Sequence, residues 1–291
     1  MAKKKANDSV VTKRVALALG VLAGVGALGA GTLYGTRYLE ERAEGFLGEE
    51  TASVQILWPA LGGGGEKDRV TWLPAGERER LTEIARTALA NSGALDVEGV
   101  RSVSRALWDQ GWFSEHPTVR RTDEGTVVVE GRWRVPAAAV RFDGRDQLIA
   151  WDGAALPLKY PRGQSGLRVI LGASFGPGEN GVIDPARSWP GEDVGAALGL
   201  LDLLRVEGLD GQVAAVDAGR VFKDGMLEIV TTRGGRVVWG APVGKFAPGQ
   251  KSDGERVDVL RALIGRTGML DAGEDRVEIY GPRVELDRRG G

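Results

Sequence analysis

The segment Gly172-Ala173-Ser174-Phe175-Gly176 has the G-x-S-x-G spacing that presents a nucleophilic serine in many hydrolases. In those enzymes the serine occupies a sharp turn between a strand and a helix, and the catalytic histidine follows it in the chain. Here the next residues, Pro177-Gly178-Glu179-Asn180-Gly181, predict a loop, and the only histidine, His116, precedes the serine. We therefore interpret the match as a coincidence of spacing.

Two glycine-rich segments resemble phosphate-binding loops, in which backbone N–H groups surround a phosphate and a Ser or Thr binds magnesium. The segment Gly240-xxx-Gly244-Lys245-Phe246 has three residues between its glycines where the motif has four, and Phe replaces the required Ser or Thr. The Gly-Gly-Glu-Lys sequence at residues 64–67 fails in the same way. Both segments are predicted to be ordinary loops.

The remaining candidates for catalysis or metal binding are one histidine and scattered carboxylates. His116 precedes a proline, which indicates a loop, and one imidazole cannot form a multi-histidine zinc site. The chain has no cysteine, which excludes disulfides, thiolate nucleophiles and thiolate metal ligands. We expect no catalytic residue, cofactor or metal. An exported enzyme stays open as an alternative, which a cleft around Asp152, Asp217 and Glu228 would support.

Residues 15–36 form a run of 22 positions without a charged side chain. As an α-helix this run is about 33 Å long, against a hydrocarbon core of about 30 Å. The basic residues Lys3, Lys4, Lys5, Lys13 and Arg14 precede it, and several glutamates follow it closely. This asymmetry predicts a single-pass protein of the cytoplasmic (inner) membrane with its N-terminus inside and its later domains extracytoplasmic. A signal peptide cleaved near residues 27–29 is the alternative.

The formal net charge of −2 conceals an asymmetry between the two ends of the chain. Residues 1–14 carry five basic and one acidic side chain, a net charge of +4, so the other residues carry −6. An acidic exported part does not favour nucleic acid as a partner. The 255 residues after Thr36 suffice for one or two domains with their own cores.

The first exported residues predict a charged stalk at 37–51 and then a small domain at 52–140. Short strands at 53–58 and 70–73 flank a glycine-rich insertion. Two amphipathic helices follow, one with apolar residues at helical spacing from Leu81 to Leu89 and one with Val100, Val103 and Leu107.

Two further strands, at 118–122 and 126–135, are joined by an Asp-Glu-Gly turn. The order strand, helix, helix, strand, strand places both helices on one face of a sheet.

The second half, residues 141–287, predicts a mixed β-domain with flanking helices. Helical stripes pass through Val194 to Leu201 and through Val257 to Ile264. The expected strands cover 147–151, 167–171, 213–216, 220–222, 226–232, 236–239, 277–280 and 284–286. Short Asp-Gly and Gly-Gly turns between several of them indicate a β-meander. The fold class predicted for the whole chain is therefore α+β, after a basic tail at 1–14 and a transmembrane helix at 15–36.

The order of these elements and several short motifs resemble the FtsQ/DivIB family of bacterial cell-division proteins. The motifs are Trp112-Phe113, Val119-Arg120-Arg121, Thr126-Val127-Val128-Val129, Arg134-Val135-Pro136-Ala137 and Leu148-Ile149-Ala150-Trp151-Asp152-Gly153. The resemblance covers essentially the whole chain and implies a POTRA-like domain followed by the FtsQ-type β-domain. Trp133 replaces the family's usual Glu before Arg134, and the glycine-rich insertion is unusual.

The resemblance implies a non-catalytic scaffold in septum formation that recruits small bitopic coiled-coil proteins similar to FtsB and FtsL. A strand at the C-terminal sheet edge has unpaired backbone groups that an incoming segment can satisfy by adding a strand. We therefore predict that Ile279, Tyr280, Arg283 and Val284 lie on the partner surface. Ordinary closure of the sheet by these residues is the competing interpretation.

A protein-transport accessory with a POTRA domain is a further alternative. It would be favoured by a large aromatic C-terminal half that forms an outer-membrane barrel. This chain has no such half, and no small-molecule ligand is expected.

Overall fold

The computed structural model of the chain describes residues 53–60, 71–90, 97–123, 125–178, 184, 187–245 and 247–287. The predictions for the basic tail, the transmembrane helix, the stalk and the glycines at 62–65 concern residues outside these ranges. None of the helices within them combines the length and the apolar character that a bilayer crossing needs.

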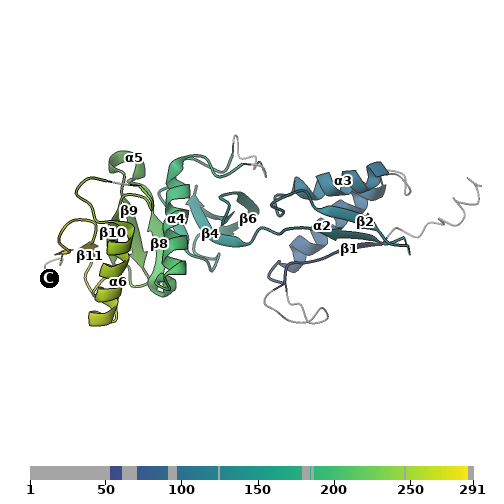
Figure 1. Cartoon of the computed structure of the whole chain (residues 1–291). Coiled ribbons are helices and arrows are strands. Elements are labelled where there is room, and N and C mark those ends of the chain that lie inside the picture. Colours follow the sequence, from purple (N-terminus) through teal and green to yellow (C-terminus); the bar gives the residue numbers. More distant parts are fainter. Residues whose placement is uncertain are drawn as a thin grey trace, which may run out of the picture. The chain divides into compact units, whose positions relative to one another are not determined.

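Residues Val54–Gly291 form one unit that contains two separate sheets (Figure 1). The smaller sheet has the order β1-β3-β2, with β1 (Val54–Ile56) parallel and β2 (Thr118–Arg121) antiparallel to β3 (Val127–Glu130). Helices α2 (Ala75–Ala90) and α3 (Val97–Trp108) lie between β1 and β2 in the chain.

Helical periodicity and a central strand buried on both faces explain the core of this part of the chain. Buried residues recur at the spacing of one helix face in α2 and α3, and consecutive buried valines fill β3. The buried side chains are Leu81, Ala85, Leu89, Val103, Leu107, Val127, Val128 and Val129. Trp112 and Phe113 are also fully buried, which explains why an aromatic pair follows α3.

The larger sheet has nine strands in the order β12-β11-β10-β9-β8-β7-β4-β5-β6. Its first strands are β4 (Pro136–Phe142), β5 (Arg145–Ala150), β6 (Ala155–Pro161) and β7 (Val169–Leu171). Helix α4 (Glu192–Val206) and the short 3-10 helix η2 (Asp210–Gln212) then lead to β8 (Val213–Asp217), α5 (Val221–Asp224), β9 (Leu227–Thr231) and β10 (Arg236–Gly240). Helix α6 (Asp253–Thr267), β11 (Arg276–Glu278) and β12 (Glu285–Asp287) complete the described chain.

Parallel and antiparallel pairs are mixed in this sheet. Strand β7 is parallel to both β4 and β8, and β10 is parallel to β11, whereas the other neighbours are antiparallel. Two of the parallel pairs, β7 with β8 and β10 with β11, are connected through α4 and α6 respectively. Parallel neighbours need such a crossover because a tight turn can only reverse the chain.

The predicted fold class, α+β with a mixed β-domain, is wrong: this part of the chain is a mixed α/β structure built on a nine-stranded sheet. The prediction treated α4 and α6 as flanking helices, but they connect parallel strands of one sheet. The expected strand at 220–222 is also wrong, because residues Val221–Asp224 form α5, which ends at Gly225 with a left-handed φ of 71°. Strands β4 and β6 were not predicted, and the expected domain boundary at residue 140 falls inside β4.

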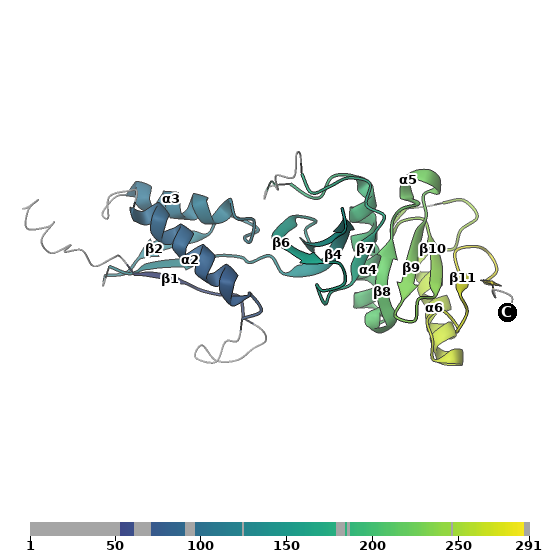
Figure 2. The same ribbon diagram turned by 180° about the vertical axis from the view of Figure 1, so that it is seen from behind.

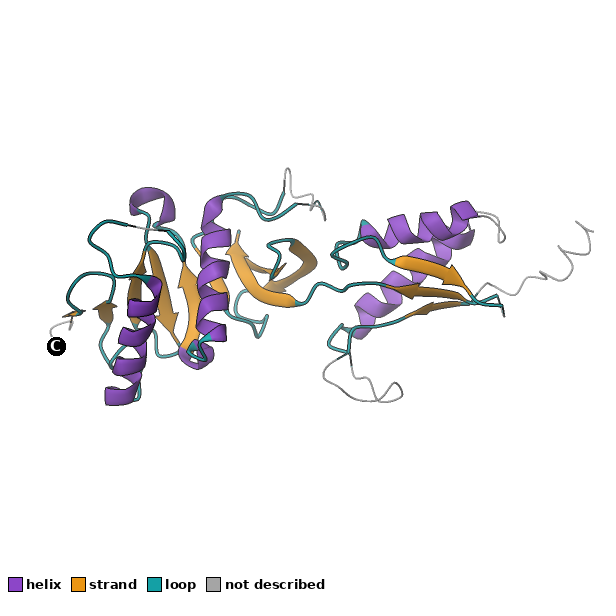
Figure 3. Cartoon of the chain, viewed as in Figure 1, coloured by secondary structure: helices purple, strands orange, loops and turns teal. Residues whose placement is uncertain are grey.

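One face of the large sheet packs against α4 and α6. Figure 3 shows both helices in front of the strands, and in the reverse view of Figure 2 the strands face the reader. The core between them contains Val216, Ile229, Val237, Trp239 and Val277 from the strands, with Val194, Ala197, Leu198, Leu200, Leu201, Leu204, Val257 and Leu260 from the helices.

We expect Leu204→Ala to lower the free energy of unfolding by about 2–5 kcal/mol, because Leu204 is fully buried in this core and its truncation leaves a cavity. Asp202→Ala, on the half-exposed side of the same helix, is the matched control and should cost less than about 1 kcal/mol. Denaturant unfolding followed by tryptophan fluorescence measures both. Equal effects would contradict the assignment of this core.

Candidate interaction surface at the C-terminal sheet edge

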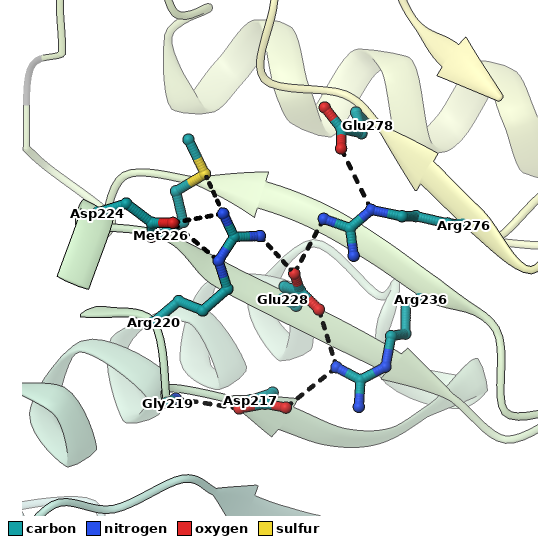
Figure 4. A network of polar contacts seen from close by, with 9 residues as sticks. All are labelled: Asp217, Gly219, Arg220, Asp224, Met226, Glu228, Arg236, Arg276 and Glu278. Atoms are coloured by element: carbon teal, nitrogen blue, oxygen red, sulfur yellow. Dashed lines mark hydrogen bonds and ion pairs between the residues drawn. The ribbon is translucent and has the colours of Figure 1, made fainter. Parts of the chain in front are cut away.

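The face of β8–β11 that α4 and α6 leave uncovered carries charged side chains. Along each of these strands the residues alternate, so the neighbours of the core residues point to the opposite face. The charged residues at these positions are Asp217, Glu228, Arg236, Arg276 and Glu278. Figure 4 shows that they form one network with Arg220 and Asp224, which belong to the segment between β8 and β9.

Glu228 is the centre of this network. Its side chain is only 4 % exposed, and three guanidinium groups surround it. Arg220 Nη1 lies 2.9 Å from Oε1, Arg236 Nη1 lies 2.8 Å from Oε2, and Arg276 Nη2 lies 3.1 Å from Oε1. The three arginines come from three different segments, so this single carboxylate on β9 connects the N-cap of α5 with β10 and β11.

The arginines are in turn held by other carboxylates. Arg236 Nη1 also donates to Asp217 Oδ2 at 3.0 Å, and Arg220 Nε donates to Asp224 Oδ2 at 2.9 Å. Arg276 Nε donates to Glu278 Oε1 at 3.2 Å. Every guanidinium of the network therefore has two carboxylate partners.

The electrostatics of the network argue against acid or base catalysis at Glu228. Burial by itself raises the pKa of Glu228, but hydrogen bonds from Arg236 and Arg220 and the charge of Arg276 outweigh it and hold the pKa below its ordinary value. The carboxylate is thus ionised at neutral pH and fully engaged by cations. Such a group stabilises structure and is a poor proton donor.

The three carboxylates considered for an enzymatic cleft do not converge. Asp217 and Glu228 approach each other through Arg236, but Asp152 Oδ2 accepts a hydrogen bond from Arg134 Nε at 2.7 Å, away from this network. No group of three or more metal-ligating side chains occurs within the described ranges.

Ser174 and His116, whose residue types suggested catalysis, both make structural contacts. The backbone N–H of Ser174 donates to Asp193 Oδ2 at 2.7 Å, and α4 begins well beyond this serine. His116 is exposed, and its ring stacks on Trp108 with 4.7 Å between centroids.

Tyr280 adjoins the network at the end of β11. Burial, a hydrogen bond with Glu278, and the negative charges of Glu278 and Glu285 raise the pKa of Tyr280 above its ordinary value of 10.0. Gly240, at the end of β10, has a φ of 98°, and a Cβ there would lie 2.6 Å from Tyr280 Cβ. The glycine thus permits the close approach of Tyr280 to β10.

Lys251 fixes the backbone on either side of Tyr280. Its N–H donates to the carbonyl of Tyr280 at 2.7 Å, and its ammonium group donates to the carbonyls of Ile279 and Gly281. The segment that leads from β11 toward β12 is thereby held against the start of α6.

The residues predicted for the partner surface have different environments. Ile279 is fully buried in the core, and its N–H donates to the carbonyl of Val238 at 3.2 Å. Tyr280 is partly buried, Arg283 is exposed, and Val284 is 38 % exposed. A surface for a partner can therefore use Tyr280, Arg283 and Val284, but the side chain of Ile279 is not accessible.

A strand was expected at 284–286, but the predicted partner surface omitted the residues that form this edge strand. Glu285, Leu286 and Asp287 form β12, and all three are exposed. Asp287 lies opposite Arg276, Leu286 opposite Val277, and Glu285 opposite Glu278. The alternation Glu-Leu-Asp was a sequence signal for an amphipathic edge strand, but its register could not be read from the sequence.

Comparison with known proteins adds no identification. No model of a known protein family matches the chain, and no curated protein sequence matches it significantly.

We expect Glu228→Gln to lower the free energy of unfolding at pH 7 by about 1.5–3 kcal/mol, because charge-assisted hydrogen bonds are lost. The pKa of Glu228 in the folded protein lies below its ordinary value of 4.5, so its contribution is present above pH 4.5. It disappears as the pH falls through the lower, folded-state pKa.

Unfolding measured between pH 7 and pH 3 should show a smaller acid-side loss of stability in Glu228→Gln than in the unsubstituted protein. Exposed Glu79, replaced by Gln, is the control. Parallel pH profiles for Glu228→Gln and the unsubstituted protein would refute the role given to this carboxylate.

Proposed function

We propose that this chain is a non-catalytic scaffold of the bacterial division machinery, anchored in the cytoplasmic membrane by residues 15–36. Its extracytoplasmic part would recruit small bitopic proteins similar to FtsB and FtsL. Two features of the sequence support this proposal. One is the uncharged run with its positive N-terminal flank, and the other is the ordered set of motifs that resemble the FtsQ/DivIB family.

The docking element in this proposal is the outer side of β12, and the exposure of this edge strand is the observation that carries it. The nine-stranded sheet ends in β6 on one side and β12 on the other. Strand β6 contains Pro157 and Pro161, which have no N–H, and exposed Lys159, all features that discourage strand addition. Strand β12 contains no proline and no lysine.

Apolar side chains beside this edge provide contacts for a partner. Leu286 is 51 % exposed and Val284 is 38 % exposed, so both side chains are accessible to a partner. Partly buried Tyr280 offers a broad ring with a polar end, a type of side chain enriched at protein interfaces. Main-chain hydrogen bonds of an added strand would provide affinity, and these side chains would provide selectivity.

The double variant Tyr280→Asp/Val284→Asp should lose most partner binding, because the loss of two contacts at the centre of an interface typically reduces affinity at least tenfold. The measurement is co-purification of membrane proteins with the full-length chain. The matched control, Leu158→Asp/Tyr160→Asp, changes the same kinds of residue on the opposite edge strand, β6.

Circular dichroism and thermal unfolding of both variants establish that they remain folded. Undiminished co-purification with folded Tyr280→Asp/Val284→Asp would reject β12 as the docking edge. Loss of binding only in the β6 control would assign the partner to the other edge.

A further inference from the structure

On the uncovered face, the acidic side chains near the C-terminal edge have fewer arginine partners than the acidic side chain at the centre. Glu228, Val238, Glu278 and Glu285 occupy laterally aligned positions on β9, β10, β11 and β12. Glu228 has three arginine partners, and Glu278 has one, Arg276. Glu285 forms no ion pair with any residue that the structure describes.

Glu278 and Glu285 lie directly opposite each other on the antiparallel pair β11 and β12. Like charges at directly opposed positions destabilise a sheet. Both carboxylates also act on Tyr280, where their negative charge disfavours ionisation of the phenol. A cation placed on the outer side of Glu285 would reduce this repulsion.

Asp287, two residue pairs further along β12, also lacks a cationic partner among the described residues. It lies opposite Arg276, but that guanidinium is engaged by Glu228 at 3.1 Å and by Glu278 at 3.2 Å. No ion pair joins Asp287 to another side chain within the described part of the chain. The two carboxylates of the edge strand thus point to the same face, and neither forms an ion pair with a cation among the described residues.

Between these two carboxylates, Leu286 points to the other face of the sheet, where it lies opposite the buried Val277. About half of its surface is exposed at the edge of that face. A strand added next to β12 would place a side chain beside Leu286, and burial there favours an apolar residue.

We infer that β12 selects an incoming strand with the pattern basic, apolar, basic, in which two cationic side chains lie beside Glu285 and Asp287 and the apolar one beside Leu286. This inference rests on the strand addition proposed above and specifies the chemistry of the partner. A second copy of this chain does not fit, because antiparallel pairing of two β12 strands about Leu286 would place Glu285 against Asp287.

The test measures binding of three labelled nine-residue peptides to the full-length chain by fluorescence anisotropy. Their centres are Lys-Val-Lys, Gln-Val-Gln and Glu-Val-Glu, within identical threonine flanks. Arg288 and Arg289, which lie outside the described residues, are present in every measurement. We expect the lysine peptide to bind about fivefold more tightly than the glutamine peptide, and the glutamate peptide to bind most weakly.

The variant Glu285→Lys/Asp287→Lys should reverse this order and favour the glutamate peptide. The control variant Glu79→Lys/Glu115→Lys changes the net charge equally at two other exposed positions and should leave the order unchanged. High salt should reduce the difference between the peptides, since exposed ion pairs are screened.

The outcomes distinguish the charge selection inferred here from the strand addition on which it rests. Equal affinities for the three peptides, with a loss of all binding in Tyr280→Asp/Val284→Asp, would support strand addition and overturn the charge selection. Binding of none of the peptides would reject strand addition at β12 and the charge selection with it. An order that changes equally in the control variant would reduce the effect to net charge and overturn the inference.

Discussion

A nearly buried carboxylate on the face that α4 and α6 leave uncovered constrains the C-terminal half of this sheet. A charge in that position is costly unless cations and hydrogen bonds surround it. Glu228 meets this requirement through Arg220, Arg236 and Arg276. Arg220 precedes α5 as its N-cap residue, and the other two arginines come from β10 and β11, so the alignment of these segments with β9 is tied to one ionised group. The apolar core holds α4 and α6 against the sheet, and the charged network on the opposite face holds neighbouring strands in alignment.

The sequence allowed individual elements to be located, because apolar periodicity is a local property. The helix expected around Leu81 to Leu89 is α2, and the stripe from Val194 to Leu201 lies in α4. The class of the fold could not be obtained in this way. A helix between two strands is compatible with a separate layer or with a crossover, and the difference depends on which strands become neighbours. Here α4 and α6 are crossovers, so the nine strands form one mixed sheet.

The elements that the sequence analysis missed have particular causes. Strand β4 begins at Pro136 and contains three consecutive alanines, so its apolar pattern is weak. Strand β6 contains two prolines, which normally argue against a strand and are tolerated here because β6 is an edge. Residues 220–222 suggested a strand, but Gly225 caps the short helix α5 in a left-handed conformation.

Only part of the candidate surface could be predicted from the sequence. The surface depends on which face of its strand each side chain occupies and on the order of the strands in the sheet. Ile279 follows Val277 at a spacing of two and therefore shares its buried face, which the period of a strand could have revealed. The network around Glu228 depends on the parallel pairing of β10 with β11, which no local pattern indicates. The acidic side chains of β12, which form no ion pair with the described residues, would also disfavour the pairing of two such edges. In the inference proposed above, an edge protected by carboxylates, and not by the lysine and prolines of β6, would exclude its own copies and stay open to a strand of opposite charge.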